Sequence, residues 1–206
     1  MLIKLYEENT NPRHLKQITE CLNDGGIIIY PTDTLYGFGC SISRPKAISK
    51  IAQIKNVKME HNTFSIICYD LSQMADYALP IQNNYFKAIK RCFPGPFTFI
   101  MDANNKVPKH LHRKKKQVGI RIPDNNISLS IIEMLGDPLI SSSLSMNINE
   151  IEYSTDPELI YERYGDMVDI VIDGGYGGTE PSTVVSFEND EFNIIRTGKG
   201  NTELIY

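Results

Sequence analysis

The chain has 206 residues, of which 41% are hydrophobic and 22% charged, and its formal net charge is −4. This length and composition are typical of one ordinary globular domain, so we exclude a disordered or fibrous protein and predict a single domain over residues 1–206. The net negative charge also excludes wholesale attraction to nucleic acid, and any such contact would need a local basic patch.

The cysteines and the apolar segments point to a cytoplasmic protein. The four cysteines are widely spaced and form no Cys-x-x-Cys pair, so we expect neither a disulfide framework nor a zinc site. We recognise no N-terminal signal peptide and no apolar run of membrane-spanning length. A cytoplasmic protein without membrane contact is therefore predicted.

Predicted strands and helices alternate along the chain. The spacing of apolar residues, with Gly and Pro near the boundaries, defines each element. Strands are expected at 1–6, 27–30, 64–68, 97–101, 118–123, 138–143, 168–173, 182–187 and 192–196, and helices at 12–24, 45–55, 70–79, 83–91, 126–135 and 156–164. The terminal hairpin around 188–190 and the short connections exclude an all-parallel sheet. We predict an α/β fold with a mixed, twisted sheet flanked by helices.

Polar residues gather where the apolar strands end. The strand at 27–30 stops at Pro31, which cannot donate to the sheet, and a loop with two threonines, an aspartate and a tyrosine follows. Clusters of this kind stand at Thr32-Asp33-Thr34, Arg121, Ser141-Ser142-Ser143, Ser182-Thr183 and Arg196-Thr197-Gly198. Because α/β proteins place ligand sites at strand ends, we expect these clusters to converge on one pocket.

Several short motifs occur in a fixed order over nearly the whole chain. They are Tyr-Pro-Thr-Asp-Thr-x-Tyr-Gly at 30–37, Pro-Gly-Pro-x-Thr at 94–98, Val-Gly-x-Arg-x-Pro at 118–123, Pro-Leu-x-Ser-x-Ser at 138–143, Pro-Ser-Thr-Val-Val at 181–185 and Arg-x-Gly at 196–198. Together they resemble the motifs of the YrdC/YciO family. Asp70-Leu71-Ser72 and His61-Asn62 make the chain more similar to the YciO branch than to YrdC itself.

This resemblance implies a YrdC-like twisted sheet with a concave, positively charged face. Family members make threonylcarbamoyl-AMP from L-threonine, bicarbonate and ATP, for a modified adenosine beside the anticodon of tRNA. Mg²⁺ would arrive with the ATP as co-substrate, and no tightly bound, protein-ligated metal is expected. Members of the family have also been described as binding double-stranded RNA.

The resemblance also implies roles for individual residues. Thr32, Thr34 and Tyr36 would line the amino-acid end of the pocket, and the guanidinium of Arg121 would neutralise a carboxylate or a phosphate. The catalytic cations, which would meet the phosphates, are Lys55 and Arg196. The remaining substrate-binding candidates are Ser141, Ser143, Ser182, Thr183 and His61.

Each of these roles has a structural alternative. The two threonines are also typical turn residues whose hydroxyls bond the backbone, and a tyrosine in this position can simply pack in the core. A lysine at a helix end is favoured by the helix dipole, and the two arginines could form salt bridges at strand ends. The glycine-rich loop at 174–178 matches no phosphate-binding fingerprint, so we expect a flexible turn or a lid there.

The chain departs from the synthase branch at two motifs. A Lys-x-Arg motif is replaced by Lys55-Asn56-Val57, and a Ser-x-Asn motif is replaced by Ser143-Leu144-Ser145. In phosphoryl transfer an arginine of this kind can be worth ~10³–10⁵ in rate, and a lost donor side chain costs roughly 10²–10³. Two interpretations therefore stay open, a threonylcarbamoyl-AMP synthase and a non-catalytic paralogue that binds nucleotide or double-stranded RNA.

One loop carries the strongest concentration of positive charge. Its candidate RNA-binding residues are Lys109, Arg113, Lys114, Lys115 and Lys116. They could contact the phosphates of double-stranded RNA or tRNA in a salt-sensitive way, or they could form a solvated loop of like charges. His110-x-His112 in this loop has poor spacing for zinc, and no metal site is expected there.

Overall fold

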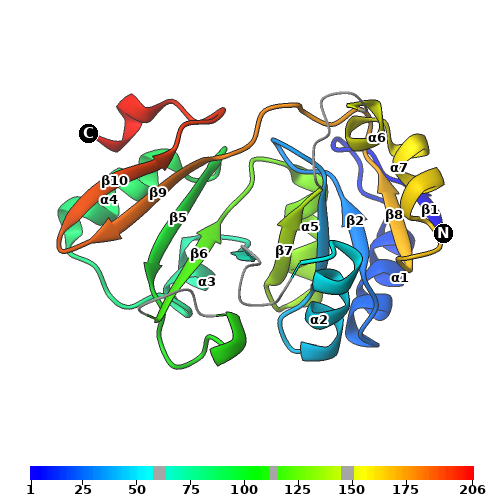
Figure 1. The fold of residues 1–206 in the computed structure, drawn as a ribbon, viewed down its shortest axis with the longest axis horizontal. Coiled ribbons are helices and arrows are strands. Elements are labelled where there is room, and N and C mark those ends of the chain that lie inside the picture. The colour runs from blue at the N-terminus through cyan, green and yellow to red at the C-terminus, as the bar shows by residue number, and fades with distance from the viewer. Residues whose placement is uncertain (58–63, 112–115, 145–150) are drawn as a thin grey trace.

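Ten strands form one twisted, unclosed mixed sheet in the described part of the chain, with helices packed on both faces (Figure 1). The structure is a computed structural model, and it describes residues 1–57, 64–111, 116–144 and 151–206. The strands are β1 (Leu2–Lys4), β2 (Ile28–Tyr30), β3 (Gly37–Ser41), β4 (Ser65–Ile67), β5 (Phe97–Asp102), β6 (Gln117–Arg121), β7 (Leu139–Ser143), β8 (Ile170–Asp173), β9 (Thr183–Glu188) and β10 (Glu191–Arg196). The predicted α/β fold with a mixed sheet is confirmed.

The α-helices of the described residues follow the predicted order. They are α1 (Pro12–Asn23), α2 (Pro45–Ile54), α3 (Leu71–Ala75), α4 (Asn83–Cys92), α5 (Asn126–Leu135), α6 (Glu152–Thr155) and α7 (Pro157–Tyr164). Two 3₁₀ turns are η2 (Lys109–Leu111) and η5 (Thr202–Ile205). None of the described helices is both long enough and apolar enough to cross a membrane.

Strand order places distant parts of the sequence side by side. The order is β1-β8-β2-β3-β7-β4-β6-β5-β9-β10, so β2 and β7 both flank β3, and β4 lies between β7 and β6. The pairs of β1 with β8, β2 with β8, β4 with β6 and β5 with β9 are parallel, and the other neighbouring pairs are antiparallel. In this order the ends of β4 and β6, at Ile67 and Arg121, lie beside the start of β7 at Leu139.

Local signals explain where several elements begin and end. The side chain of Asn125 caps α5 by accepting a hydrogen bond from the Ser128 amide, and α5 ends at Gly136, which has a left-handed φ of 76°. Pro157 follows the capping residue Asp156 at the start of α7. Asn189 and Asp190 both have positive φ values, as a two-residue hairpin turn between β9 and β10 requires.

The core lies on both faces of the sheet. Alternate residues of β2 point to opposite faces, so Ile29 belongs to one buried cluster and Ile28 to the other. The larger cluster includes residues of α2, α3, α4 and α7, and the smaller one is formed with α1 and α5. Because both faces of β2 are covered, its sequence is a continuous apolar run rather than an alternating one.

Two elements were missed by the sequence analysis. We assigned residues 37–41 to a polar loop, but they form β3, which pairs with β2 on one side and β7 on the other. Glycines at 37 and 39 weaken the local strand signal, and pairing with two neighbours outweighs it. The short helix α6 just before α7 was also not predicted.

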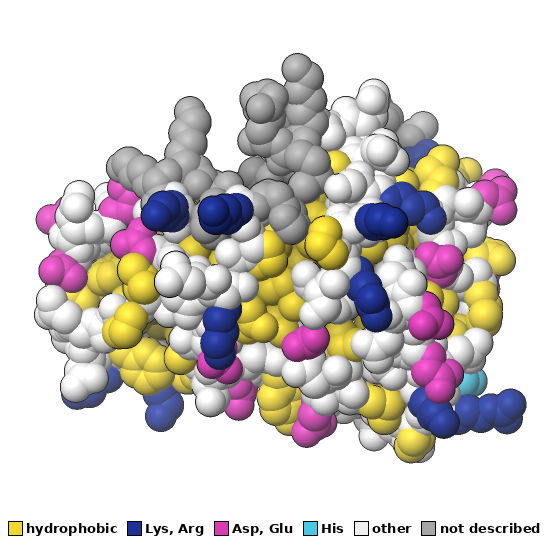
Figure 2. All heavy atoms as spheres, turned by 90° about the horizontal axis from the view of Figure 1, so that it is seen from below, with side chains coloured by type: hydrophobic (Ala, Val, Ile, Leu, Met, Phe, Trp, Pro, Cys, Tyr) yellow, Lys and Arg dark blue, Asp and Glu magenta, His cyan; other side chains and the backbone are white. Residues whose placement is uncertain are grey.

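Charged side chains are mixed on the face seen from below in Figure 2. Among the described residues on that face, Lys and Arg side chains stand singly or in pairs, and acidic and hydrophobic side chains lie between these groups. No broad basic surface is visible among the described residues on this side.

Candidate functional site

A cavity of about 480 Å³ is lined by residues of β4, β5, β6, β7, β9 and β10, together with Leu35 and Lys55. It brings together six residues that the sequence analysis singled out, namely Lys55, Arg121, Ser141, Ser143, Ser182 and Arg196. Five of them, all but Lys55, come from the strand-end clusters that we expected to converge, whereas no residue of the Thr32-Asp33-Thr34 cluster lines the cavity. Three cations and several hydroxyls share the cavity wall with apolar side chains that include Leu35, Val184 and Ile195.

Lys55 lies at one end of the cavity. It follows the last residue of α2, and its Nζ donates hydrogen bonds to Ser142 Oγ at 2.8 Å and to Ser143 O at 2.5 Å. Both partners are uncharged, and burial lowers the pKa of Lys55. An ammonium held by neutral acceptors keeps its charge available to an incoming anion.

Val57 does not take part in this wall. It is 38% exposed and is not among the residues that line the cavity, so this apolar side chain does not replace the arginine of the Lys-x-Arg motif. Ser145, the other departure from the synthase branch, lies outside the described residues.

Arg196 lies across the cavity on β10, next to a bulge in the β9–β10 pairing. Its Nη2 and Nε donate to Ser182 O at 2.8 and 3.2 Å. The hydroxyls of Ser182 and Thr98 form a buried hydrogen bond at 2.9 Å. Burial lowers the pKa of Arg196, and the neighbouring Arg121 cation lowers it further. This end of the cavity thus holds two nearby guanidinium groups and a pair of hydroxyls.

Thr183 lies behind this wall. It is fully buried, and its hydroxyl donates to Gly200 O at 2.8 Å and accepts from the Gly198 amide at 3.0 Å. These bonds hold the segment 198–200 against the start of β9. In this structure Thr183 therefore shapes the cavity wall without lining it.

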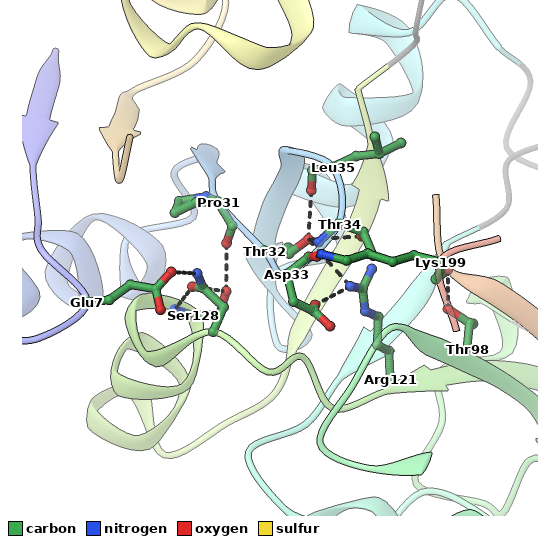
Figure 3. Close-up of polar contacts among 12 residues, drawn as sticks. Glu7, Pro31, Thr32, Asp33, Thr34, Leu35, Thr98, Arg121, Ser128 and Lys199 are labelled. Atoms are coloured by element: carbon green, nitrogen blue, oxygen red, sulfur yellow. Dashed lines mark hydrogen bonds and ion pairs between the residues drawn. The ribbon is translucent and has the colours of Figure 1, made fainter. Parts of the chain in front are cut away.

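Arg121 is paired with Asp33 in the floor of the site (Figure 3). The two side chains are each only 8% exposed, and Arg121 Nη2 donates to Asp33 Oδ1 and lies 3.5 Å from Thr32 Oγ1. The other carboxylate oxygen of Asp33 and Nε of Arg121 are buried, and among the described residues they have no hydrogen-bond partner. The salt bridge that we left open as an alternative for Arg121 is present, and it lies inside the site.

The two threonines of the 32–34 cluster bond mainly within their own loop. Thr32 Oγ1 donates to Leu35 O at 2.8 Å, accepts from the Thr34 amide at 3.1 Å and lies 3.1 Å from Thr34 Oγ1. Neither threonine lines the cavity, whereas Leu35 does. Their hydroxyls therefore fix the turn that places Leu35 in the wall and Asp33 beside Arg121.

Tyr36 is buried and fastens the glycine-rich loop. Its hydroxyl donates to Gly175 O at 2.7 Å and accepts from the Gly174 amide at 3.1 Å, and burial raises its pKa. A Cβ on Gly178 would lie 2.3 Å from Thr34 O, so the two loops pack backbone against backbone. The loop we expected to be a flexible turn or lid is anchored at these points.

Five polar residues at or next to the site were not assigned a role from the sequence. Ser65, Thr98 and Ser142 line the cavity, whereas Asp33 and Lys199 do not line it: Asp33 bonds the lining residue Arg121, and Lys199 bonds Asp33. Asp33 and Thr98 stand within the motifs recognised at 30–37 and 94–98, so the sequence motifs could have identified both as site residues. Lys199 donates from Nζ to Asp33 O at 2.5 Å across 166 residues of sequence, and no local pattern marks it.

Several predicted residues lie outside the site or outside the described residues. His61, Arg113, Lys114 and Lys115 belong to ranges that the structure does not describe. Lys109 and Lys116 are exposed and do not line the cavity. Within the described ranges, no group of three or more His, Cys, Asp or Glu side chains is placed to hold a metal ion.

Comparisons with known proteins agree with this geometry. The family model Sua5_yciO_yrdC, described as "Telomere recombination", matches residues 20–198. An uncharacterized protein of Haemophilus influenzae is 39% identical over 96% of this chain and 95% of its own length. A putative threonylcarbamoyl-AMP synthase of Methanocaldococcus jannaschii is 33% identical over 96% of this chain and 92% of its own length.

Two solved structures share the fold. The crystal structure of Escherichia coli YciO matches with a TM-score of 0.91 and 34% identity, over 100% of this chain and 99% of that one. The crystal structure of P. abyssi Sua5 complexed with L-threonine matches with a TM-score of 0.84 and 24% identity. That match covers 96% of this chain and 57% of the Sua5 chain.

Proposed function

This chain belongs to the Sua5/YciO/YrdC family, and from that premise we propose that its cavity binds L-threonine and ATP and forms threonylcarbamoyl-AMP. Bicarbonate would be the third substrate, and the product would serve the threonylcarbamoyladenosine modification of tRNA. The family relation to threonylcarbamoyl-AMP synthases and the structure of a Sua5 protein with L-threonine support this choice.

One observation carries the proposal. Cations from three separate strands or helices, Lys55, Arg121 and Arg196, meet in a cavity that also presents serine hydroxyls. Arg121 is buried with Asp33 as its partner, whereas Lys55 and Arg196 bond only neutral groups and can offset the charge of an anionic ligand. The two substrates both carry negative charge, on the carboxylate of L-threonine and on the phosphates of ATP. When they are bound together, these charges lie at opposite ends of the pair.

The chemistry proceeds in two steps. The neutral amine of threonine attacks the carbon of bicarbonate or CO₂, which forms an N–C bond and releases water or a proton. An oxygen of the resulting carbamate then attacks the α-phosphorus of ATP, and pyrophosphate leaves. Both steps depend on holding the reactants in contact, which an enclosed site provides.

Residues of the cavity have distinct tasks in these steps. Arg121 would bind the carboxylate of threonine, and Lys55 and Arg196 would offset the charge that develops on the phosphates. Mg²⁺ would enter with ATP and neutralise phosphate charge. The hydroxyls of Ser182 and Thr98 can bond ligand oxygens without adding charge.

A second candidate function is nucleotide binding without turnover. The observation in its favour is Val57, which stands at the arginine position of the Lys-x-Arg motif and does not line the cavity. Binding of double-stranded RNA or tRNA is a further possibility for this candidate, and Lys109 and Lys116 are the described basic-loop residues that are exposed to it.

A product assay separates these candidates. Purified protein is incubated with ATP, L-threonine and bicarbonate, and threonylcarbamoyl-AMP is measured by mass spectrometry together with pyrophosphate. We expect product from the wild type and its loss in Lys55→Met and Arg196→Gln. Lys106→Met is the matched control, because Lys106 pairs with Asp76 on the surface away from the cavity. ATP binding with no product would favour nucleotide binding without turnover. Salt-dependent RNA binding by the same protein would add RNA to the ligands of this second candidate.

A further inference from the structure

We propose that Lys199 is a specificity-determining residue, whose ammonium supplies the positive charge that selects a free carboxylate at the amino-acid end of the cavity. The inference rests on the proposed function, because it concerns how the same site recognises L-threonine. It adds a residue that no motif marked and predicts a preference for a free amino acid over an amide or ester.

The need for another cation follows from the state of Arg121. Its guanidinium is bonded to the carboxylate of Asp33, and both side chains are almost fully buried. Each partner therefore cancels the charge of the other, and this pair alone presents donors to a ligand but no net positive charge. A carboxylate entering beside Asp33 would also meet a like charge, which disfavours it.

Lys199 offsets this deficit. Its Nζ lies 2.5 Å from the backbone oxygen of Asp33, which is a neutral acceptor. In the described part of the chain, Lys199 takes part in no ion pair with a carboxylate. Figure 3 shows its side chain reaching the loop that carries Thr32 and Thr34, where it meets the backbone oxygen of Asp33. Asp33, Arg121 and Lys199 together carry one net positive charge, which matches one carboxylate.

The backbone that carries Lys199 is well anchored. The Lys199 amide donates to Pro181 O at 2.9 Å, and the adjacent glycines bond the hydroxyl of Thr183 from both sides. At Gly198 a Cβ would lie 2.2 Å from Pro181 O, so the segment packs tightly on the start of β9. The ammonium of Lys199 is thus presented from a fixed backbone, while its side chain stays exposed to an entering ligand.

The other two cations of the cavity are left for the phosphates. Lys55 and Arg196 have neutral partners, on Ser142, Ser143 and Ser182, and lie on other parts of the wall. The carboxylate of L-threonine and the phosphates of ATP would thus each meet their own positive charge. Replacing the carboxylate of threonine by an amide would therefore remove the group that Lys199 recognises.

The test compares ligands with and without the carboxylate. Calorimetry measures the Kd of L-threonine and of L-threonine amide for the wild type, Lys199→Met, Lys199→Gln and the surface control Lys106→Met. Glutamine keeps an N–H donor for Asp33 O but has no charge. We expect both Lys199 variants to bind L-threonine roughly five- to tenfold more weakly, with L-threonine amide affected less than twofold. The loss should shrink as salt concentration rises.

Each outcome has a clear meaning. If Lys199→Gln binds L-threonine as tightly as the wild type does, the inference is overturned while the proposed function stands. If both ligands weaken equally in both variants, Lys199 acts by holding the loop, and the inference is again overturned. If the wild type binds no L-threonine, the proposed function fails and the inference fails with it.

Discussion

The buried pair of Asp33 and Arg121 makes a sharp prediction about stability. Changing Asp33 to Asn removes the negative partner and leaves the guanidinium of Arg121 buried without a counter-charge. Breaking such a pair costs about 3–5 kcal/mol in unfolding free energy. Two buried polar atoms of the pair already have no hydrogen-bond partner among the described residues, so we expect a loss near the lower end, about 3 kcal/mol.

Thermal and urea denaturation measure this loss. A loss of about 3 kcal/mol should lower the Tm by roughly 6–12 °C for a chain of this size and shift the urea midpoint by about 1–2 M. The matched control is Asp76→Asn, which breaks the pair with Lys106, whose two side chains are 62% and 56% exposed. That surface pair should contribute at most about 1 kcal/mol.

A double variant tests the physical cause. If the cost comes from an unpaired buried charge, then Asp33→Asn combined with Arg121→Met should be more stable than Asp33→Asn alone. The reasoning would be refuted if Asp33→Asn lowered the Tm no more than Asp76→Asn did, or if the double variant were the less stable of the two.

Three further predictions concern the walls of the site. Tyr36→Phe removes the hydroxyl that bonds two backbone groups of the glycine-rich loop, so it should cost about 1–3 kcal/mol by urea denaturation, and an unchanged midpoint would contradict that anchoring role. Gly178→Ala forces a Cβ against Thr34 O and should lower stability by about 1–3 kcal/mol, in contrast to Gly175→Ala, where the added Cβ meets no neighbour and only a positive φ opposes it. Because burial lowers the pKa of Lys55, its ammonium loses its proton at a lower pH than an ordinary lysine does, and ATP affinity should fall at that lower pH. Lys55→Arg should move this fall to a higher pH, and a pH profile that is identical in the two proteins would argue against Lys55 as a phosphate ligand.

Much of the fold was predictable because its signals are local. The run of apolar residues in β2, the caps of α5 and α7 and the two-residue turn between β9 and β10 each depend on side chains a few positions apart. The strand β3 was not predictable in this way, because its glycines have low strand propensity and its formation depends on pairing with β2 and β7.

Part of the site was predictable for a related reason. Lys55, Arg121, Ser182 and Arg196 stand at or near element ends, and a sheet of this class brings such ends together. The motif around Thr32 was recognised, but its hydroxyls bond their own turn, a choice that the sequence left open. The basic loop and His61 remain predictions, since most of those residues lie outside the described ranges.

By itself the sequence determined the alternation of strands and helices and the residue types available at each strand end, since both follow from spacing and composition within short windows. Only the tertiary structure decided which charges meet. Arg121 and Asp33 are 88 residues apart, and Lys199 and Asp33 are 166 apart. These contacts follow from the order of strands in the sheet, which packing of the whole chain selects and no local periodicity encodes.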